Sequence, residues 1–164
     1  MEISKLITIT KHDKFMIGGK RLFCFEPLRE QTHNYTDDII PLWADFNTYY
    51  LKLFILTKYD IRIYDAVTGK LVKIFTELMD ANSSAELSSF TFDYRFRKFI
   101  IGDNAGGIRI YNCSNGALMN VVREPEVQQF QEDKNTEISD LKFCIEDKLL
   151  ISSSWDSKLR IYDQ

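Results

Sequence analysis

Short runs of branched and aromatic residues recur along this chain, and each is followed across a polar turn by one five-residue pattern. The pattern reads Ile-Arg-Ile-Tyr-Asp at residues 61–65, Ile-Arg-Ile-Tyr-Asn at 108–112 and Leu-Arg-Ile-Tyr-Asp at 159–163. The apolar runs before it span residues 53–56, 99–101 and 149–151. Runs this short and this rich in branched and aromatic side chains are typical of strands buried on both faces. Each run and the pattern after it therefore predict a β-hairpin.

The predicted hairpins recur at a nearly constant interval. Arg62, Arg109 and Arg160 are 47 and 51 residues apart, an interval typical of stacked β architectures. A strand-like segment precedes each hairpin, and a fourth segment follows two of them; these segments are 39–46, 87–93, 138–144, 71–75 and 117–122. A weaker first copy comprises residues 6–10, 14–17 and 22–25. The sequence thus predicts units of four antiparallel strands, joined by polar loops at residues 30–38, 76–86 and 123–137.

Residues 149–163, which contain Ser-Trp-Asp-Ser-Lys ahead of the arginine pattern, resemble the WD-repeat β-propeller family. Tyr162 and Asp163 stand at the family's terminal Trp-Asp position, and residues 99–112 match nearly as well. The resemblance covers essentially the whole chain as four units. It implies an all-β fold: a WD40-like β-propeller segment over residues 1–164, with about four blades of four antiparallel strands and an incomplete last blade. The blades would be approximately residues 1–36, 37–78, 85–123 and 136–164.

The sequence departs from that family in its polar signature. No Gly-His dipeptide opens a unit, and His12 and His33 are the only histidines. Asp156 alone matches the family's turn aspartate, because Ala105 stands at that position in the third unit. Tyrosines 64, 111 and 162 take the aromatic role. We therefore expect apolar stacking to hold the blades together more than the family's buried hydrogen-bond relay.

A narrower resemblance involves the third and fourth units. Phe92-Asp93, the segment 97–103, the pattern at 108–112, Asn115-Gly116 and the phrase at 154–158 are similar to the large WD-repeat proteins of ciliary axonemes. This resemblance implies a non-enzymatic scaffold that binds other proteins, in the cytoplasm and as a component of the axoneme or doublet microtubule. The alternatives are a cytosolic signalling or trafficking adaptor that binds peptide motifs and, more remotely, a propeller enzyme.

Composition and charge disfavour several other classes of protein. The net charge of −3 argues against a nucleic-acid-binding protein, which usually carries a basic stripe. No run of 18 apolar residues suggests a membrane span, and the first residues lack the features of a signal peptide. Cys24, Cys113 and Cys144 are too few and too widely spaced for a disulfide framework or a zinc site, so we expect buried, reduced thiols.

Candidate chemistry along the chain has simpler structural explanations. Two histidines, predicted to lie in a turn and a loop of the weak first unit, make a catalytic triad improbable. The recurrent acids at unit ends are expected to bond backbone amides in turns; they are Asp60, Asp65, Asp103, Asp156 and Asp163. The glycine-rich segment 102–107 precedes a strand rather than a helix, so it predicts a hairpin turn and not a phosphate-binding loop. The three pattern arginines are expected to form salt links with these acids. We expect no catalytic, cofactor or metal site.

The last unit has no fourth strand, because the sequence ends at Gln164. Repeat units bury their faces only against neighbours, so we expect a further part of a longer chain, or a partner chain, to complete the propeller; closure as a four-bladed ring is the other possibility. Partner contacts are expected in the inter-unit loops, with Trp155, Glu126 and Gln129 as candidates. Trp43, within an apolar segment, is expected to be core.

Overall fold

The computed structural model gives strand backbone for residues 5–9, 14–18, 22–26 and 29–34. It describes residues 40–66, 68–79, 83–123, 135–144, 146 and 148–163 with their side chains. All regular structure in these residues is β-strand, which confirms the all-β prediction. The chain divides into an N-terminal unit, Met1–Thr76, and a C-terminal unit, Glu77–Gln164.

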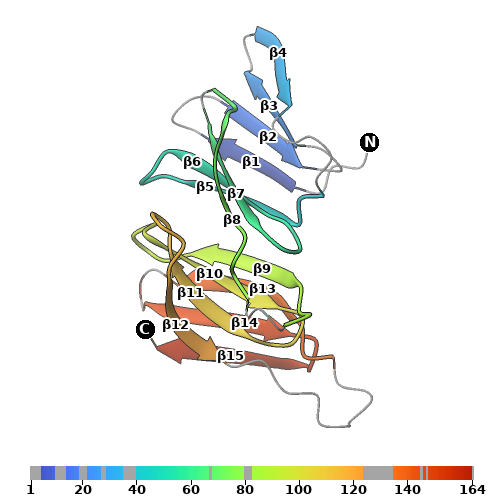
Figure 1. Ribbon diagram of the computed structural model, residues 1–164, viewed down its shortest axis with the longest axis vertical. Helices are drawn as coiled ribbons and strands as arrows, with labels where there is room; N and C mark the ends of the chain where they lie inside the picture. The colour runs from blue at the N-terminus through green and yellow to red at the C-terminus, as the bar shows by residue number, and fades with distance from the viewer. Residues whose placement is uncertain are drawn as a thin grey trace. The chain divides into compact units, whose positions relative to one another are not determined.

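The N-terminal unit holds two antiparallel sheets of four strands, each in sequential order (Figure 1). The first contains β1 (Lys5–Ile9), β2 (Lys14–Gly18), β3 (Leu22–Glu26) and β4 (Arg29–Asn34). The second contains β5 (Trp43–Asn47), β6 (Lys52–Leu56), β7 (Ile61–Asp65) and β8 (Leu71–Phe75). In the second sheet β6 and β7 are joined by a short turn, and in the first β2 and β3 are adjacent antiparallel strands, as the hairpin pattern predicted.

Strand β4 corrects the sequence analysis, which placed residues 30–38 in a polar loop and His33 with them. Residues 29–34 pair with β3, and His33 lies opposite Cys24 in that ladder. As the last strand of its sheet, β4 is held by backbone hydrogen bonds along one side and needs no apolar alternation. A polar outer strand therefore gives no hydrophobic signal. His12 lies outside the described residues.

The C-terminal unit holds a four-stranded and a three-stranded antiparallel sheet. The first contains β9 (Leu87–Phe92), β10 (Lys98–Asp103), β11 (Ile108–Asn112) and β12 (Leu118–Arg123). The second contains β13 (Ile138–Cys144), β14 (Leu149–Ser154) and β15 (Lys158–Asp163). Strands β10 and β11 form a hairpin through residues 104–107, so the glycine-rich segment is a turn, as predicted.

The two sheets of the C-terminal unit share one apolar core. Ile100, Ile108 and Ile110 of the first sheet pack against three residues of the second, Ile138, Leu141 and Leu150. The Ser88 hydroxyl donates to the Ile138 carbonyl at 2.8 Å, where β9 and β13 lie side by side (Figure 1). A Cβ on Gly102 would lie 2.7 Å from the Ile138 Cβ, so glycine allows this close approach.

Burial separates the predicted inner strands into two kinds. Strands β6 and β10 are buried on both faces apart from their first residues, as predicted. Strand β14 alternates instead: Leu150, Ser152 and Ser154 are buried, while Leu149, Ile151 and Ser153 are half-buried. The prediction of full burial is wrong for β14 because only one face of its sheet packs against the neighbouring sheet, through Leu150.

Candidate interaction surfaces

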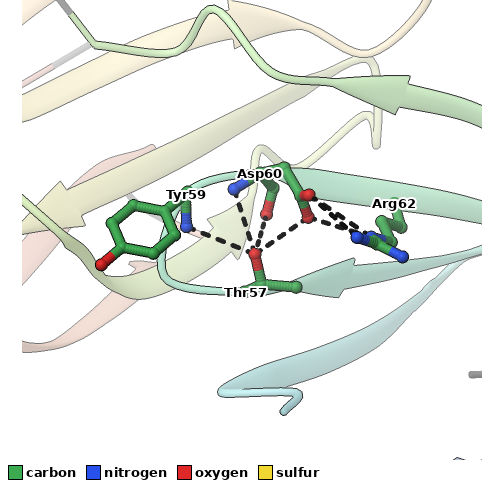
Figure 2. Close-up of polar contacts among 4 residues, drawn as sticks. All are labelled: Thr57, Tyr59, Asp60 and Arg62. Atoms are coloured by element: carbon green, nitrogen blue, oxygen red, sulfur yellow. Dashed lines mark hydrogen bonds and ion pairs between the residues drawn. The ribbon is translucent and has the colours of Figure 1, made fainter. Parts of the chain in front are cut away.

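The arginine of the recurrent pattern pairs with an aspartate in each of the three sheets whose side chains are described. In the N-terminal unit, Asp60 precedes β7 and Arg62 lies within it; Arg62 Nε is 3.2 Å from Asp60 Oδ1. Figure 2 shows how Thr57 fixes this turn: its hydroxyl lies 2.9 Å from Asp60 Oδ1 and accepts from the Asp60 amide at 3.1 Å. The hydrogen bonds that Arg62 donates to Asp60 raise the pKa of Arg62. The cluster stabilises a turn and presents no unused catalytic group.

The equivalent pair in the C-terminal unit is buried. Arg109 donates to Asp103 Oδ2 at 2.7 Å, and both side chains are almost fully buried. Asp103 Oδ1 also accepts from the Ala105 and Gly107 amides, at 2.9 and 2.7 Å. A Cβ on Gly107 would lie 2.4 Å from Asp103 Oδ2. Ala105 stands at the family's aspartate position, so the pattern arginine of this sheet pairs instead with Asp103, two residues earlier.

The third pair, Asp156 and Arg160, lies at the turn between β14 and β15. Arg160 donates to both carboxylate oxygens, at 3.1 and 2.5 Å, and the Lys158 amide donates to Oδ1 at 3.0 Å. The hydrogen bonds from Arg160 hold the pKa of Asp156 well below its usual range. The predicted salt links between pattern arginines and turn acids are thus confirmed in all three sheets.

The two cysteines with described side chains, Cys113 and Cys144, lie in different environments. Cys113 is buried, and Cys144 is half-buried rather than buried as expected. Burial raises the pKa of the Cys113 thiol, and the nearby Asp93 carboxylate raises it further. A thiol held protonated is a poor nucleophile and metal ligand. Among the residues with described side chains, no three His, Cys, Asp or Glu residues gather closely enough to hold a metal ion.

The sheet β13–β15 exposes an apolar face. Leu159 and Ile161 are 66% and 60% exposed, and alternation along β15 puts them on the same face. Their counterparts in β11, Ile108 and Ile110, are 0% and 2% exposed because the next sheet covers them. Because the pattern repeats, β15 exposes the same kind of apolar surface that β11 buries against the neighbouring sheet.

The predicted contact residues have different outcomes. Trp155, at the turn before β15, is 64% exposed, and its amide donates to the Glu137 carbonyl at 3.1 Å. Glu126 and Gln129 lie outside the described residues. Trp43 is half-buried rather than a core residue, because it opens β5 at the end of its sheet.

A cavity of about 240 Å³ lies where two turns of the C-terminal unit meet. Asp93 and Tyr94 of the β9–β10 turn and Lys98 at the start of β10 line one side, and Phe143 of β13 and Lys148, just before β14, line the other. This site was not predicted, because its two sides are about 50 residues apart in the sequence. One signal was available: Asn112 replaces the aspartate that ends the other two copies of the pattern.

Known structures share this arrangement of sheets. The chain superposes on the WD40 β-propeller domain of Doa1 with a TM-score of 0.70 and 14% identity, covering 99% of this chain and 51% of that one. The fold is that of a WD40 β-propeller. The computationally designed Ika4 protein also matches, with a TM-score of 0.69 and 13% identity over 99% of this chain and 91% of Ika4. At these identities, the two matches show the WD40 fold and do not indicate a function.

One relative is similar in sequence over most of the chain. This WD40-like chain is 28% identical over 123 residues to cilia- and flagella-associated protein 337 B of Tetrahymena thermophila. The match covers 75% of the chain and 10% of the relative, so the chain spans about a tenth of the relative's length. No family model matches the chain. No helix in the described residues is long and apolar enough to cross a membrane.

Proposed function

We propose that this chain is a non-enzymatic scaffold for protein interactions and that it works within a ciliary or flagellar assembly, as part of the axoneme. The blades would be residues 1–36, 37–78, 85–123 and 136–164. The WD40 fold and the relative with a ciliary and flagellar name support the proposal. The acids Asp103 and Asp156 are bound to arginines and backbone amides, which favours a structural role over a hydrolytic one.

The observation that carries the proposal is the exposed face of β15. Leu159 and Ile161 expose branched side chains whose counterparts Ile108 and Ile110 bury against a neighbouring sheet. Exposed apolar surface of this kind marks a protein contact. We propose that another sheet of the propeller, from a further part of a longer chain or from a partner chain, covers this face, with Trp155 at its edge.

The test is retention in detergent-extracted cilia. The tagged chain is expressed in ciliated cells, and its share in the axonemal pellet is compared with its share in the cytoskeletal pellet of non-ciliated cells. We expect enrichment with axonemes, and a loss of at least half of it in the double variant Leu159→Lys and Ile161→Lys. The matched control is Leu118→Lys and Met119→Lys, two exposed positions on β12.

Each negative outcome removes a different part of the proposal. Equal recovery from ciliated and non-ciliated cells would contradict the axonemal assignment and favour the cytosolic adaptor. Enrichment that survives the β15 double variant but not the β12 variant would show that the open face of β15 is not the contact.

A further inference from the structure

The cavity between the β9–β10 and β13–β14 turns is lined by two lysines, Lys98 and Lys148, and by one carboxylate, Asp93. In the N-terminal unit, Lys52 lies opposite Asp65 in the β6–β7 ladder, and Nζ is 2.5 Å from the carboxylate. Lys98 takes the same place on β10, but its partner across the ladder is Asn112. Among the described residues, no carboxylate forms an ion pair with Lys98.

A second lysine approaches from the facing turn. Lys148 lines the same cavity, and its Nζ lies 5.9 Å from the centre of the Tyr94 ring. Its backbone is in the left-handed region, with φ of 56°. The guanidinium of Arg95 lies 4.9 Å from the same ring. Two lysines against one carboxylate, Asp93, leave a net positive charge on the cavity lining and favour an anionic ligand.

The acid in the cavity wall is already bound. Asp93 Oδ1 accepts from the Arg97 and Lys98 amides, each at 2.8 Å, so this carboxylate fixes its own turn. The rings of Tyr94 and Phe143 stack with centroids 6.1 Å apart and form an apolar wall. A carboxylate on a short aliphatic stem matches both features, since its methylenes can pack on rings while its oxygens reach ammonium groups.

We propose that this cavity binds an acidic side chain, glutamate or aspartate, presented by a segment of a partner protein. The carboxylate lies between Lys98 and Lys148, and the aliphatic stem packs on Tyr94 and Phe143. The site goes beyond the proposed ciliary role, because binding by the purified chain does not depend on where the protein works in the cell.

The test uses the full 164-residue chain and a fluorescein-labelled hexaglutamate peptide, with hexaglutamine as the uncharged match, followed by fluorescence anisotropy at low ionic strength. We expect hexaglutamate alone to bind. The double variant Lys98→Gln and Lys148→Gln should bind roughly tenfold more weakly, because two charge-assisted hydrogen bonds are lost. The control Lys70→Gln and Lys142→Gln removes the same net charge from exposed positions and should change the affinity less than twofold.

The location is checked by methyl NMR of the same titration. The Ile110 methyl, which lines the cavity, should shift with hexaglutamate, while the Ile161 methyl on the open face of β15 should not. An unchanged urea midpoint in the cavity variant shows that it folds. Equal weakening by the two double variants, binding of hexaglutamine as tight as that of hexaglutamate, or no binding would each overturn the proposal.

Discussion

Strands β11 and β15 carry nearly the same five residues and lie in different surroundings. In β11 the pattern is buried up to its last residue, including Arg109. In β15 the aliphatic residues Leu159 and Ile161 are exposed, and Arg160 is half-buried. Both copies form the third strand of their sheet and both pair their arginine with a turn aspartate. The local pattern thus determines the strand and the salt link, whereas the neighbouring sheet determines how much each interaction contributes to stability.

The largest expected difference concerns the two ion pairs. Arg109→Met leaves Asp103 as a buried carboxylate without its cation, and breaking a buried pair from one side costs about 3–5 kcal/mol. Arg160→Met breaks a pair whose aspartate is almost fully buried but whose arginine is 22% exposed, so water can partly replace the cation and we expect a smaller cost of about 1–3 kcal/mol. Urea unfolding followed by circular dichroism measures both free energies of unfolding. Equal losses in the two variants would contradict the role assigned to burial.

The next difference concerns the core side chains. Ile110→Ala removes a side chain packed between two sheets, and such truncations cost about 2–5 kcal/mol. Ile161→Ala, at the equivalent position of β15, removes an exposed side chain and should stay within about 0.5 kcal/mol of the parent. The same urea titration applies. A large loss for Ile161→Ala in the isolated chain would mean that the face of β15 is already covered, for example in a self-associated form.

These contrasts show what the sequence could predict. The hairpins β6–β7, β10–β11 and β14–β15 follow from apolar runs and turn residues, which are local properties. The exposure of Leu159 and Ile161 does not, because it depends on whether another sheet lies beside them. Strand β4 escaped prediction because backbone pairing alone holds a polar outer strand.

The polar groups divide in the same way. The pairing of the pattern arginines with nearby acids was predictable, because the partners lie within six residues of each other. The bonding of Asp103 to backbone amides was also predicted, but its second bond, from the other carboxylate oxygen to Arg109, depends on the geometry of the turn. The cavity was not predictable, because the two segments that line it come together only in the folded chain. The sequence indicates it only through Asn112, which stands opposite Lys98 where the other two copies of the pattern have aspartate.

A smaller effect is expected where the sheets approach each other. A Cβ on Gly102 would lie 2.3 Å from Ser89 Oγ and 2.7 Å from the Ile138 Cβ, so Gly102→Ala forces the sheets apart. Overpacking of this kind costs about 1–3 kcal/mol. The equivalent residue of β14 is Ser153, which is half-buried and hydrogen-bonds Ser139 at 2.9 Å. Ser153→Ala is therefore the control and should cost no more than about 1 kcal/mol.

Amide hydrogen exchange sharpens that experiment. Gly102→Ala should speed the exchange of the β13 amides in particular, because β13 packs against β10. Equal acceleration throughout β9–β12, with β13 unaffected, would show that the substitution strains its own sheet and not the contact between the sheets.

The smallest expected effect is the pH dependence of the Asp156–Arg160 pair. Bonding to Arg160 lowers the pKa of Asp156 in the folded state, whereas in the unfolded state it returns to about 3.9. The pair therefore stabilises the fold fully above the unfolded pKa and loses its contribution as pH falls below about 4 towards the folded pKa. Because Arg160 contacts water, the contribution at neutral pH should not exceed about 1 kcal/mol. Free energies of unfolding for the parent and Asp156→Asn should differ at about pH 7 and converge below about pH 4; a difference that is constant with pH would mean that the carboxylate acts through its hydrogen-bond geometry and not through its charge.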